Sequence, residues 1–362
     1  MKAALYFKHN DTKVVSVISN YPIPVVKSGQ ALVKVLAAGI NARDPKLIAN
    51  PIPEIIIPTP KVVGSDVCGV VISTERCKTN RLKVGDKVIA MLELLFNTQG
   101  AVAEYLAIDE TDLVPSPSGL SAVEASAIPL VGLTVMQAML PYSRSVHQQT
   151  ANRRILIQGG SGGIGSFAVQ YCKRVLGMHV TATCGTSHVE YVQSLGADNV
   201  IDYTDPATSF LHTVTNCDVV LDSKSYIYEK ATLASSVLSP GGWYIHIPSS
   251  PNTLQGRDRD PLHCSIPESR MDRYLANKCK KFYYNTIVHL LKRGNHLHYG
   301  YGFVKRNSNQ LAVIASYYTS KDIQPPAINV FTMDTMGVQA ALALMETGHT
   351  LGKIVIKIAE NF

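Results

Sequence analysis

One strand–turn–helix segment, residues 154–176, constrains the fold of this 362-residue chain more than any other. Its sequence is RILIQGGSGGIGSFAVQYCKRVL. Residues 155–157 form a short apolar run without polar alternation, which is typical of a strand buried on both faces of a parallel sheet. After a glycine-dense turn, apolar residues recur at helical spacing from Phe167 to Val175. The segment therefore predicts a buried strand, a tight turn and a helix.

The glycines of that turn fit the pattern G-x-G-x-x-G at Gly160, Gly162 and Gly165. In a dinucleotide-binding fold these glycines permit a tight turn, close approach of the backbone to a pyrophosphate, and close helix–strand contact. Backbone N–H groups at the helix N-terminus then face the phosphates. A glycine-rich turn without a nucleotide is the alternative. The βα units that follow favour a Rossmann domain, with further strands expected at 181–183, 200–202, 219–221 and 243–247.

The choice of dinucleotide depends on the end of the second strand, which reads VTATCGTSH. A site that prefers NAD usually has Asp or Glu about 20 residues after the glycines, whereas Thr183 and Cys184 stand at this position. A carboxylate would repel a 2′-phosphate, and a neutral loop of Thr186, Ser187 and His188 can donate hydrogen bonds to one. The sequence therefore favours NADPH over NADH.

The same loop contains no Arg or Lys to pair with the phosphate charge. A protonated His188 can supply that charge, and Tyr203, after the third strand, can donate its hydroxyl. The alternative is that His188 only begins the next helix and faces solvent.

Composition limits the class of protein. The chain is 46% hydrophobic and 17% charged, which suits about two domains with substantial cores. Its 34 basic and 27 acidic residues give a net charge of +7, but the basic residues are dispersed, so a nucleic-acid partner is not expected. No apolar run approaches the roughly 18 residues of a membrane span. The seven cysteines are scattered, as in an intracellular protein with reduced thiols.

The order of the predicted elements gives two domains. Residues 1–128 are rich in short strands and turns, and an apolar helical stretch at 122–140 is interrupted at Pro129. A long polar segment, 248–298, contains a predicted helix at 270–291, and such a connection is usually functional. Beyond it we expect a strand at 300–305, helices at 310–318 and 337–346, and a last strand at 353–358. The prediction is a β-rich domain of residues 1–128 and 325–362 and a Rossmann domain of residues 129–324.

Several landmarks then occur in one order along the chain. Together they resemble the medium-chain dehydrogenase/reductase superfamily, quinone oxidoreductase branch. The resemblance implies an α/β fold with a GroES-like β-rich catalytic domain, split between both chain ends, around a Rossmann domain with a doubly wound parallel sheet. The landmarks are GINARD (39–44), GSDVCGVV (64–71), KVGDKV (83–88), GAVAEY (100–105), AIPLVGLTVMQAM (127–139), the glycine turn, LGADNVIDY (195–203) and GHTLGKIVI (348–356).

The zinc alcohol dehydrogenases of that superfamily hold their catalytic zinc with a Cys in the first landmark and a His-Glu pair in the second. Here those places read Asn41 and Ser65-Asp66, and no four-cysteine cluster follows. Zinc needs about four N, S or carboxylate ligands. Three histidines between 289 and 298 also lack cysteine partners. We therefore expect no metal.

Without zinc, hydride from NADPH can reach an acceptor that needs weaker electrophilic help, such as a quinone or an α,β-unsaturated carbonyl. The resemblance implies that Asn41 and Asp44 are catalytic residues near the nicotinamide. Two structural alternatives stay open: Asn41 only satisfies backbone groups at a turn, and Asp44, before Pro45, only caps the helix that follows.

The resemblance also implies which residues contact the cofactor. For Lys353, the alternative to a cofactor contact is a surface position on its strand. Two departures from the family pattern are notable: a glycine pair is replaced at 222–225 by Asp-Ser-Lys-Ser, and residues 46–60 lack the tyrosine of enoyl-thioester reductases. The implied cofactor-binding residues are Thr134, Gly160, Ser161, Gly162, Gly163, Ile164, Gly165, Thr186, Ser187, His188, Tyr203, Tyr301, Gly302, Phe303 and Lys353.

The leading prediction is a zinc-independent, NADPH-dependent reductase of quinones or related conjugated carbonyls. The alternative is a catalytically weak NADPH-binding interaction protein on the same fold, because the altered residues 223–225 could crowd the nicotinamide ribose. Segments at 179–203, 271–274 and 298–303 resemble a mitochondrial member of the branch, which implies mitochondria. A cytoplasmic location is the alternative, because the sequence enters its first predicted strand at once. A homodimer is kept as an alternative to a monomer.

Overall fold

The structure is a computed structural model that describes residues 1–8, 15–49, 56, 58–93, 98–145, 153–205, 214–223, 237–247, 298–301 and 304–359. The chain divides into two compact units. Unit 1 contains Met1–Leu133 and Lys305–Phe362, and unit 2 contains Thr134–Val304. The helix predicted at 270–291 and nearly all of the segment 248–298 lie outside the described residues.

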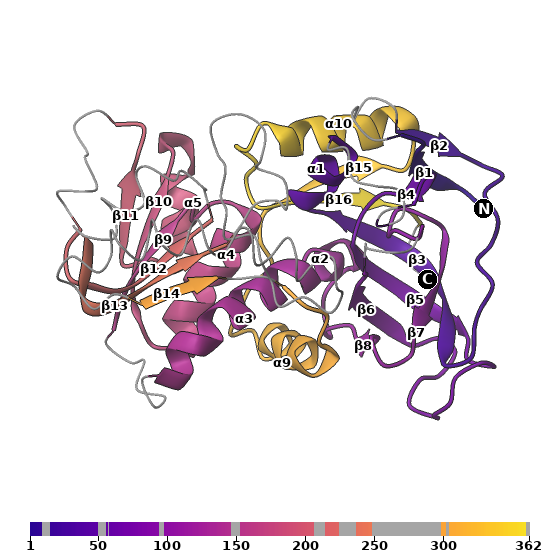
Figure 1. The fold of residues 1–362 in the computed structure, drawn as a ribbon, viewed down its shortest axis with the longest axis horizontal. Coiled ribbons are helices and arrows are strands. Elements are labelled where there is room, and N and C mark those ends of the chain that lie inside the picture. The colour runs from indigo at the N-terminus through magenta and orange to yellow at the C-terminus, as the bar shows by residue number, and fades with distance from the viewer. Residues whose placement is uncertain are drawn as a thin grey trace. The chain divides into compact units, whose positions relative to one another are not determined.

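Unit 1 is built mainly of antiparallel strands. A three-stranded sheet has the order β2-β1-β4, and a seven-stranded sheet has the order β15-β16-β3-β5-β6-β8, with β7 paired to β3. This sheet is drawn in indigo, purple and yellow in Figure 1, because its strands come from both ends of the chain. The strands are β1 (Ala3–Tyr6), β2 (Ser16–Ile18), β3 (Gln30–Ile40), β4 (Lys61–Val62), β5 (Asp66–Ser73), β6 (Lys87–Met91), β7 (Tyr105–Asp109), β8 (Val114–Pro115), β15 (Ile328–Thr332) and β16 (Lys353–Lys357).

The hydrophobic core of unit 1 lies between its sheets and helix α10 (Thr335–Glu346). Along β3, Ala31, Val33 and Val35 are buried while Gln30, Leu32 and Lys34 are half-buried, which is the alternation of a strand with one face on the core. From α10, Val338 and Leu342 join the same core cluster. The helix begins at Asp334, whose side chain accepts a hydrogen bond from the Gly337 N–H.

Three more helices belong to the first part of the chain. They are α1 (Arg43–Ala49), α2 (Ala122–Ser126) and α3 (Pro129–Ser145). Ser121 and Glu124 form a capping box at the start of α2. The predicted interruption at Pro129 is confirmed, because α3 begins there, and a proline at the first helical position sacrifices no intrahelical N–H bond.

Unit 2 contains a six-stranded parallel sheet in the order β11-β10-β9-β12-β13-β14. The chain moves outward from β9 in both directions, as in a doubly wound Rossmann fold. Residues 155–157 of β9 are at most 1% exposed, which confirms the predicted buried strand. The elements are β9 (Arg154–Gln158), α4 (Gly163–Gln170), β10 (His179–Cys184), α5 (Val189–Ser194), β11 (Asn199–Asp202), β12 (Cys217–Asp222), β13 (Leu238–His246) and β14 (His298–Tyr301).

Some predicted boundaries shift. Helix α4 continues as a π-helical turn (Tyr171–Val175), where Phe167 stacks on Tyr171 with ring centroids 5.6 Å apart. The strand expected at 300–305 overlaps β14 (His298–Tyr301), in which Tyr301 pairs with His246 of β13. Helix α9 (Ser308–Thr319) packs near β8 and belongs to compact unit 1, whereas the sequence placed it in the Rossmann domain. The predicted domain boundaries otherwise stay a prediction.

Candidate active site and dinucleotide site

A cluster of polar side chains is buried in unit 1 where three strand ends meet. Asn41 follows β3, Asp66 begins β5, and Lys353 begins β16. Strand register brings them together, because Ile40 pairs with Ile354 and Gly39 pairs with Asp66.

Asn41, Asp66 and Lys353 are each at most 4% exposed, so their polar atoms must find partners within the protein. Gly39 lets the backbone segments approach this closely, since a Cβ there would lie 2.5 Å from the carbonyl oxygen of Ser126.

The bonds within this cluster link a cation to an amide and a carboxylate. The Lys353 Nζ donates to Asn41 Oδ1 at 2.5 Å, Asp66 Oδ2 at 3.2 Å and the Ile40 carbonyl oxygen at 3.4 Å. The Asn41 Nδ2 donates to Asp66 Oδ2 at 2.9 Å and Ser65 Oγ at 3.1 Å. Lys353 is therefore a buried member of an ion pair, and the alternative of a surface position is wrong.

The other oxygen of Asp66 faces the beginning of helix α3. Asp66 Oδ1 accepts a hydrogen bond of 2.9 Å from the Leu130 N–H, one of the first N–H groups of that helix. Negative charge is stabilised near a helix N-terminus. The Asp66 carboxylate is thus held by an ammonium group, an amide and a helix end.

Asp44 lies next to this cluster in the first turn of α1. Its Oδ2 accepts from the Asn41 N–H at 2.6 Å, and its own N–H donates to the Asn41 carbonyl oxygen at 2.9 Å, so Asp44 fixes the turn that precedes α1. Burial raises the pKa of Asp44 to about 6, while Arg43 opposes the rise. The side chain of Asn41, by contrast, bonds to Ser65, Asp66 and Lys353 rather than to the turn.

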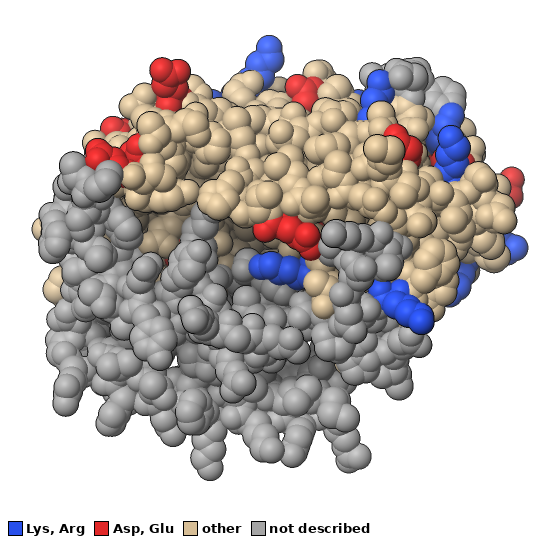
Figure 2. Space-filling model, turned by 90° about the horizontal axis from the view of Figure 1, so that it is seen from above, with Lys and Arg blue, Asp and Glu red and all other residues tan. Residues whose placement is uncertain are grey.

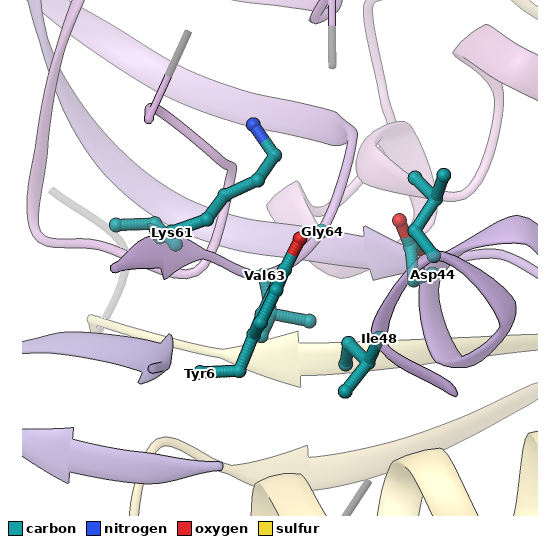
Figure 3. Close-up of a pocket in the computed structure, with 8 residues that line it drawn as sticks. Tyr6, Asp44, Ile48, Lys61, Val63 and Gly64 are labelled. Atoms are coloured by element: carbon teal, nitrogen blue, oxygen red, sulfur yellow. The ribbon is translucent and has the colours of Figure 1, made fainter. Parts of the chain in front are cut away.

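A small cavity of about 10 Å³, room for roughly one water molecule, adjoins Asp44 between α1, β1 and β4. Figure 3 shows Tyr6 between Lys61 on one side and Asp44 and Ile48 on the other. The Lys61 side chain is 1% exposed, and its Nζ donates to the Gln99 carbonyl oxygen at 3.0 Å. Burial lowers the pKa of Lys61 to about 8 and raises that of Tyr6. The sequence analysis missed both residues, because a single Lys or Tyr in a strand carries no motif.

The glycine turn of unit 2 has the packing that its sequence predicts. A Cβ on Gly165 would lie 2.1 Å from the Gly159 carbonyl oxygen, and one on Gly160 would lie 2.9 Å from the Ala182 Cβ. At Gly162, by contrast, the one described atom that a Cβ would meet is the Gly159 oxygen, at 3.7 Å. Gly160 and Gly165 therefore allow helix and strand to touch, whereas Gly162 leaves the N-terminus of α4 open to a ligand.

The loop after β10 lies against this turn. His188 Nδ1 is 3.2 Å from Ser161 Oγ, so His188 is half-buried beside the turn and does not simply face solvent. Ser187 is exposed, and Tyr203 is 43% exposed beside Gly185. Gly163 and Ile164 form the half-buried first residues of α4.

An acidic residue near the loop was missed in the sequence analysis. Asp202 ends β11, paired with Cys184 at the end of β10. Its carboxylate accepts hydrogen bonds from Thr186 Oγ1 at 2.5 Å and Thr204 Oγ1 at 2.6 Å, and these bonds lower its pKa. The sequence signal that could have revealed Asp202 is its position at the end of the strand next to β10, because neighbouring parallel strands end at one edge of the sheet.

The remaining predicted residues fall at different places. Thr134 is buried in α3 as the first residue of unit 2, and Tyr301 ends β14. Gly302 and Phe303 lie outside the described residues, as do Lys224 and Ser225. Ser223 Oγ donates to the Gln158 carbonyl oxygen at 3.0 Å, so its side chain folds back onto β9.

Asp222, which precedes Ser223, belongs to a buried polar group at the ends of β12 and β13. Its Oδ2 accepts from the Tyr244 hydroxyl at 2.6 Å and lies 3.5 Å from His246 Nδ1. All three side chains are at most 2% exposed. This group fixes the carboxyl edge of the sheet, where nucleotides bind in open α/β folds.

A GroES-like β-unit and a Rossmann sheet with a glycine turn define the fold class of a medium-chain dehydrogenase. Comparison with known proteins agrees. Residues 27–118 match the family model described as alcohol dehydrogenase GroES-like domain, and residues 195–356 match the model described as zinc-binding dehydrogenase.

Individual relatives are similar over nearly the whole chain. The mitochondrial NAD(P)H oxidoreductase RTN4IP1 of Danio rerio is 29% identical over 380 residues, covering 100% of this chain and 92% of its own. The chloroplastic quinone-oxidoreductase QR1 of Triphysaria versicolor is 31% identical over 340 residues, covering 93% of this chain and 92% of its own. The solved quinone oxidoreductase of Coxiella burnetii has a TM-score of 0.76 at 23% identity, with 99% of each chain covered.

The chain belongs to the quinone oxidoreductase branch of the medium-chain dehydrogenase/reductase superfamily and is an oxidoreductase. The predicted resemblance and fold class are confirmed. Its relatives include both mitochondrial and chloroplastic proteins.

Two observations concern helix hydrophobicity and surface charge in the described part of the chain. Across the described ranges, no helix is long and apolar enough to cross a membrane. Figure 2 shows one face, on which lysine and arginine side chains lie scattered among acidic ones.

Proposed function

We propose that the chain transfers hydride from NADPH to quinones or related conjugated carbonyl compounds, and that it does so without zinc. The names of its relatives support this: one is an NAD(P)H oxidoreductase and another a quinone-oxidoreductase. The proposal that zinc is not needed is supported mainly by the Lys353 ammonium group. This group contacts Asn41 and Asp66, which by resemblance stand at the positions of zinc ligands in the zinc alcohol dehydrogenases.

The glycine turn fits a dinucleotide. Gly162 leaves open space before α4, and the N–H groups of that helix end can face a pyrophosphate. Ser161 and His188 lie together beside this turn and would hold the phosphates, with Thr186 and Tyr203 nearby. NADPH, when bound, supplies a hydride from its nicotinamide ring. We retain the other predicted cofactor contacts, including Thr134 and Tyr301, as part of the proposal.

The residues at the expected zinc position do not fit zinc. Of the described side chains, no group of three or more His, Cys, Asp or Glu could hold a metal ion. Asn41, Ser65 and Asp66 already share bonds with Lys353, and a second cation beside its ammonium group would be repelled. These bonds support the proposal that the chain works without zinc at this position.

The buried cluster acts as a fixed electrostatic element. Each of the three N–H groups of a lysine ammonium can donate one bond, and Lys353 Nζ has three oxygen partners within 3.4 Å. Asn41 uses both its amide nitrogen and its oxygen inside the cluster. We propose that Asn41 orients Lys353 and Asp66, and that Asp44 fixes the turn that carries Asn41.

The test is oxidation of NADPH by the purified chain with a panel of quinones and enones. We expect acceptor-dependent loss of NADPH absorbance, unchanged after treatment with a chelator, and no stoichiometric zinc by elemental analysis. Absence of turnover on every acceptor would contradict the activity. A rate that falls on chelation and returns with zinc would contradict the zinc-independent mechanism.

The competing proposal is a protein that binds NADPH without efficient turnover. This proposal is motivated by the replacement of a glycine pair at 222–225. The argument is weaker for Ser223, because its side chain folds back onto Gln158. A thermal-shift titration with NADPH and NADH separates the two proposals. A shift without turnover favours the binding protein, whereas a shift with turnover favours the reductase.

For location, we propose mitochondria, supported by the mitochondrial relative from Danio rerio. A tagged full-length protein should coincide with a mitochondrial marker in cells. A diffuse cytosolic signal would favour the cytoplasmic alternative.

A further inference from the structure

We propose that Arg43 binds the carbonyl oxygen of the acceptor and stabilises the negative charge that develops there during hydride transfer. The ligand class is a conjugated carbonyl compound, or the enolate or phenolate that its reduction produces. Reduction of the acceptor rests on the proposed function, whereas binding of an oxyanion by Arg43 does not.

The guanidinium group of Arg43 has few hydrogen-bond partners. Such a group carries five N–H donors, and within the described ranges the Arg43 side chain makes one hydrogen bond, from Nη2 to the Leu92 carbonyl oxygen at 3.4 Å. Its Nε is a buried atom for which the described residues supply no acceptor. Leaving a buried donor unsatisfied is costly. The donor therefore requires an explanation, and a functional role in binding a ligand is one.

The same guanidinium group lies at the strand ends that carry the buried cluster of unit 1. Arg43 begins α1, two residues after Asn41. Leu92, which accepts its hydrogen bond, follows β6 and donates its own N–H to the Ser65 carbonyl oxygen at 2.7 Å. By resemblance, Asn41 and Ser65 stand at positions of zinc ligands in the zinc alcohol dehydrogenases. Arg43 therefore brings a positive charge to the part of unit 1 where those enzymes hold their Lewis acid.

The nearby carboxylates are held by groups other than Arg43. Asp44 Oδ2 accepts a hydrogen bond from the Asn41 N–H, and Asp66 pairs with Lys353. The Arg43 charge does act on Asp44: burial raises the pKa of Asp44 to about 6, and Arg43 is the largest opposing influence. A planar guanidinium group can direct several N–H donors at an oxyanion, and such charge-assisted bonds are strong. A ligand oxygen that becomes negative is thus a suitable partner.

The proposed step is charge stabilisation and balances as follows. An enone gains hydride at its β-carbon, where a C–H bond forms, and the displaced π electrons move to the carbonyl oxygen while NADPH becomes NADP⁺. The Arg43 N–H groups hold the enolate oxygen without losing a proton, and the α-carbon then takes a proton from water. A quinone becomes a hydroquinone anion, whose oxygen takes the proton. Fixed donors aimed at a developing oxyanion typically contribute roughly 10²–10³-fold to a rate.

Turnover with NADPH gives the first readout. We expect Arg43→Gln to lower kcat/KM at least about tenfold and to leave the Kd for NADPH unchanged. Among the acceptors that the wild type reduces, the loss should be greater for weaker electrophiles, because their anions are less stable by themselves. Added guanidinium chloride should restore part of the rate of Arg43→Ala. The matched control is Arg76→Gln, which removes the same charge from an exposed turn of unit 1.

Binding of a phenolate gives the second readout and needs no turnover. The probe is 4-nitrophenolate, which resembles a reduced quinone, titrated at pH 8 with the purified full chain with and without NADP⁺. The wild type should bind it and shift its visible absorbance. Arg43→Gln and Arg43→Met should bind at least about tenfold more weakly, Arg43→Lys should retain part of the binding, and Arg76→Gln should bind like the wild type. Thermal melting of each variant verifies folding.

The outcomes separate the two proposals. Phenolate binding that depends on Arg43, without turnover on any acceptor, would contradict the proposed function and support the oxyanion site. Unchanged turnover and unchanged phenolate binding in folded Arg43→Gln and Arg43→Met would overturn the role of Arg43. An equal loss on every acceptor that guanidinium does not relieve would mean that Arg43 is a structural residue. Absence of phenolate binding by the wild type would overturn the oxyanion site.

Discussion

Replacing Lys353 with methionine tests whether the buried cluster of unit 1 is a coupled ion pair. Lys353 and Asp66 are 2% and 0% exposed, and their charged atoms lie 3.2 Å apart. Removing one partner of a buried pair typically costs about 3–5 kcal/mol, because the other charge stays buried without compensation. Asp66 keeps two donors at 2.9 Å, Asn41 Nδ2 and the Leu130 N–H. We therefore expect a loss of about 3 kcal/mol, at the lower end of that range.

The assay is urea unfolding at pH 7, with the free energy of unfolding taken from midpoint and slope. The control is Lys357→Met, at an exposed position of the same strand, and it should change stability by no more than about 0.5 kcal/mol. The double variant Lys353→Met, Asp66→Asn removes both charges. It should cost less than the sum of the two single variants, with a coupling free energy of about 1–3 kcal/mol.

Two results would refute this reasoning. One is a loss below about 1 kcal/mol in Lys353→Met, which would mean that the buried carboxylate does not depend on the ammonium group. The other is additivity of the two substitutions within about 0.5 kcal/mol, which would mean that the two charges do not interact.

Other substitutions test the remaining steps. The pKa of Asp44 is raised from 3.8 to about 6 in the folded chain, so the contribution of Asp44 to stability is greatest below that window and is lost as pH rises through it; in parallel melting curves the wild type should lose stability relative to Asp44→Asn through that window, and a constant difference would contradict the shift. Gly165→Ala should cost about 1–3 kcal/mol in chemical unfolding because its Cβ would overlap the Gly159 oxygen. Gly162→Ala should unfold like the wild type yet bind NADPH more weakly in calorimetry. Asp202→Asn removes a negative charge beside Thr186, so the ratio of NADPH to NADH affinity should rise several-fold in parallel titrations; an unchanged ratio would mean that Asp202 only orders the loop.

Local features of the sequence determined much of the fold. The β9 strand, the glycine turn and α4 follow one another within residues 154–170, and their periodicity and glycine spacing require no distant partner. Pro129 separates α2 from α3 for a similar local reason. The landmark motifs, which occur in one order along the chain, also identified the family. These features are short-range, because strand burial, helix starts and tight turns depend on neighbouring residues.

The sites depended on tertiary structure. Lys353 bonds to Asn41 across 312 positions of sequence, and only the pairing of β16 with β3 brings the two together. Asp202 reaches Thr186 because β11 and β10 end at the same edge of the parallel sheet. Lys61 owes its lowered pKa to burial, which no pattern around residue 61 reveals. Register and desolvation are properties of the packed chain, so the sequence by itself determined the fold and the family, and the tertiary structure decided which polar groups face one another.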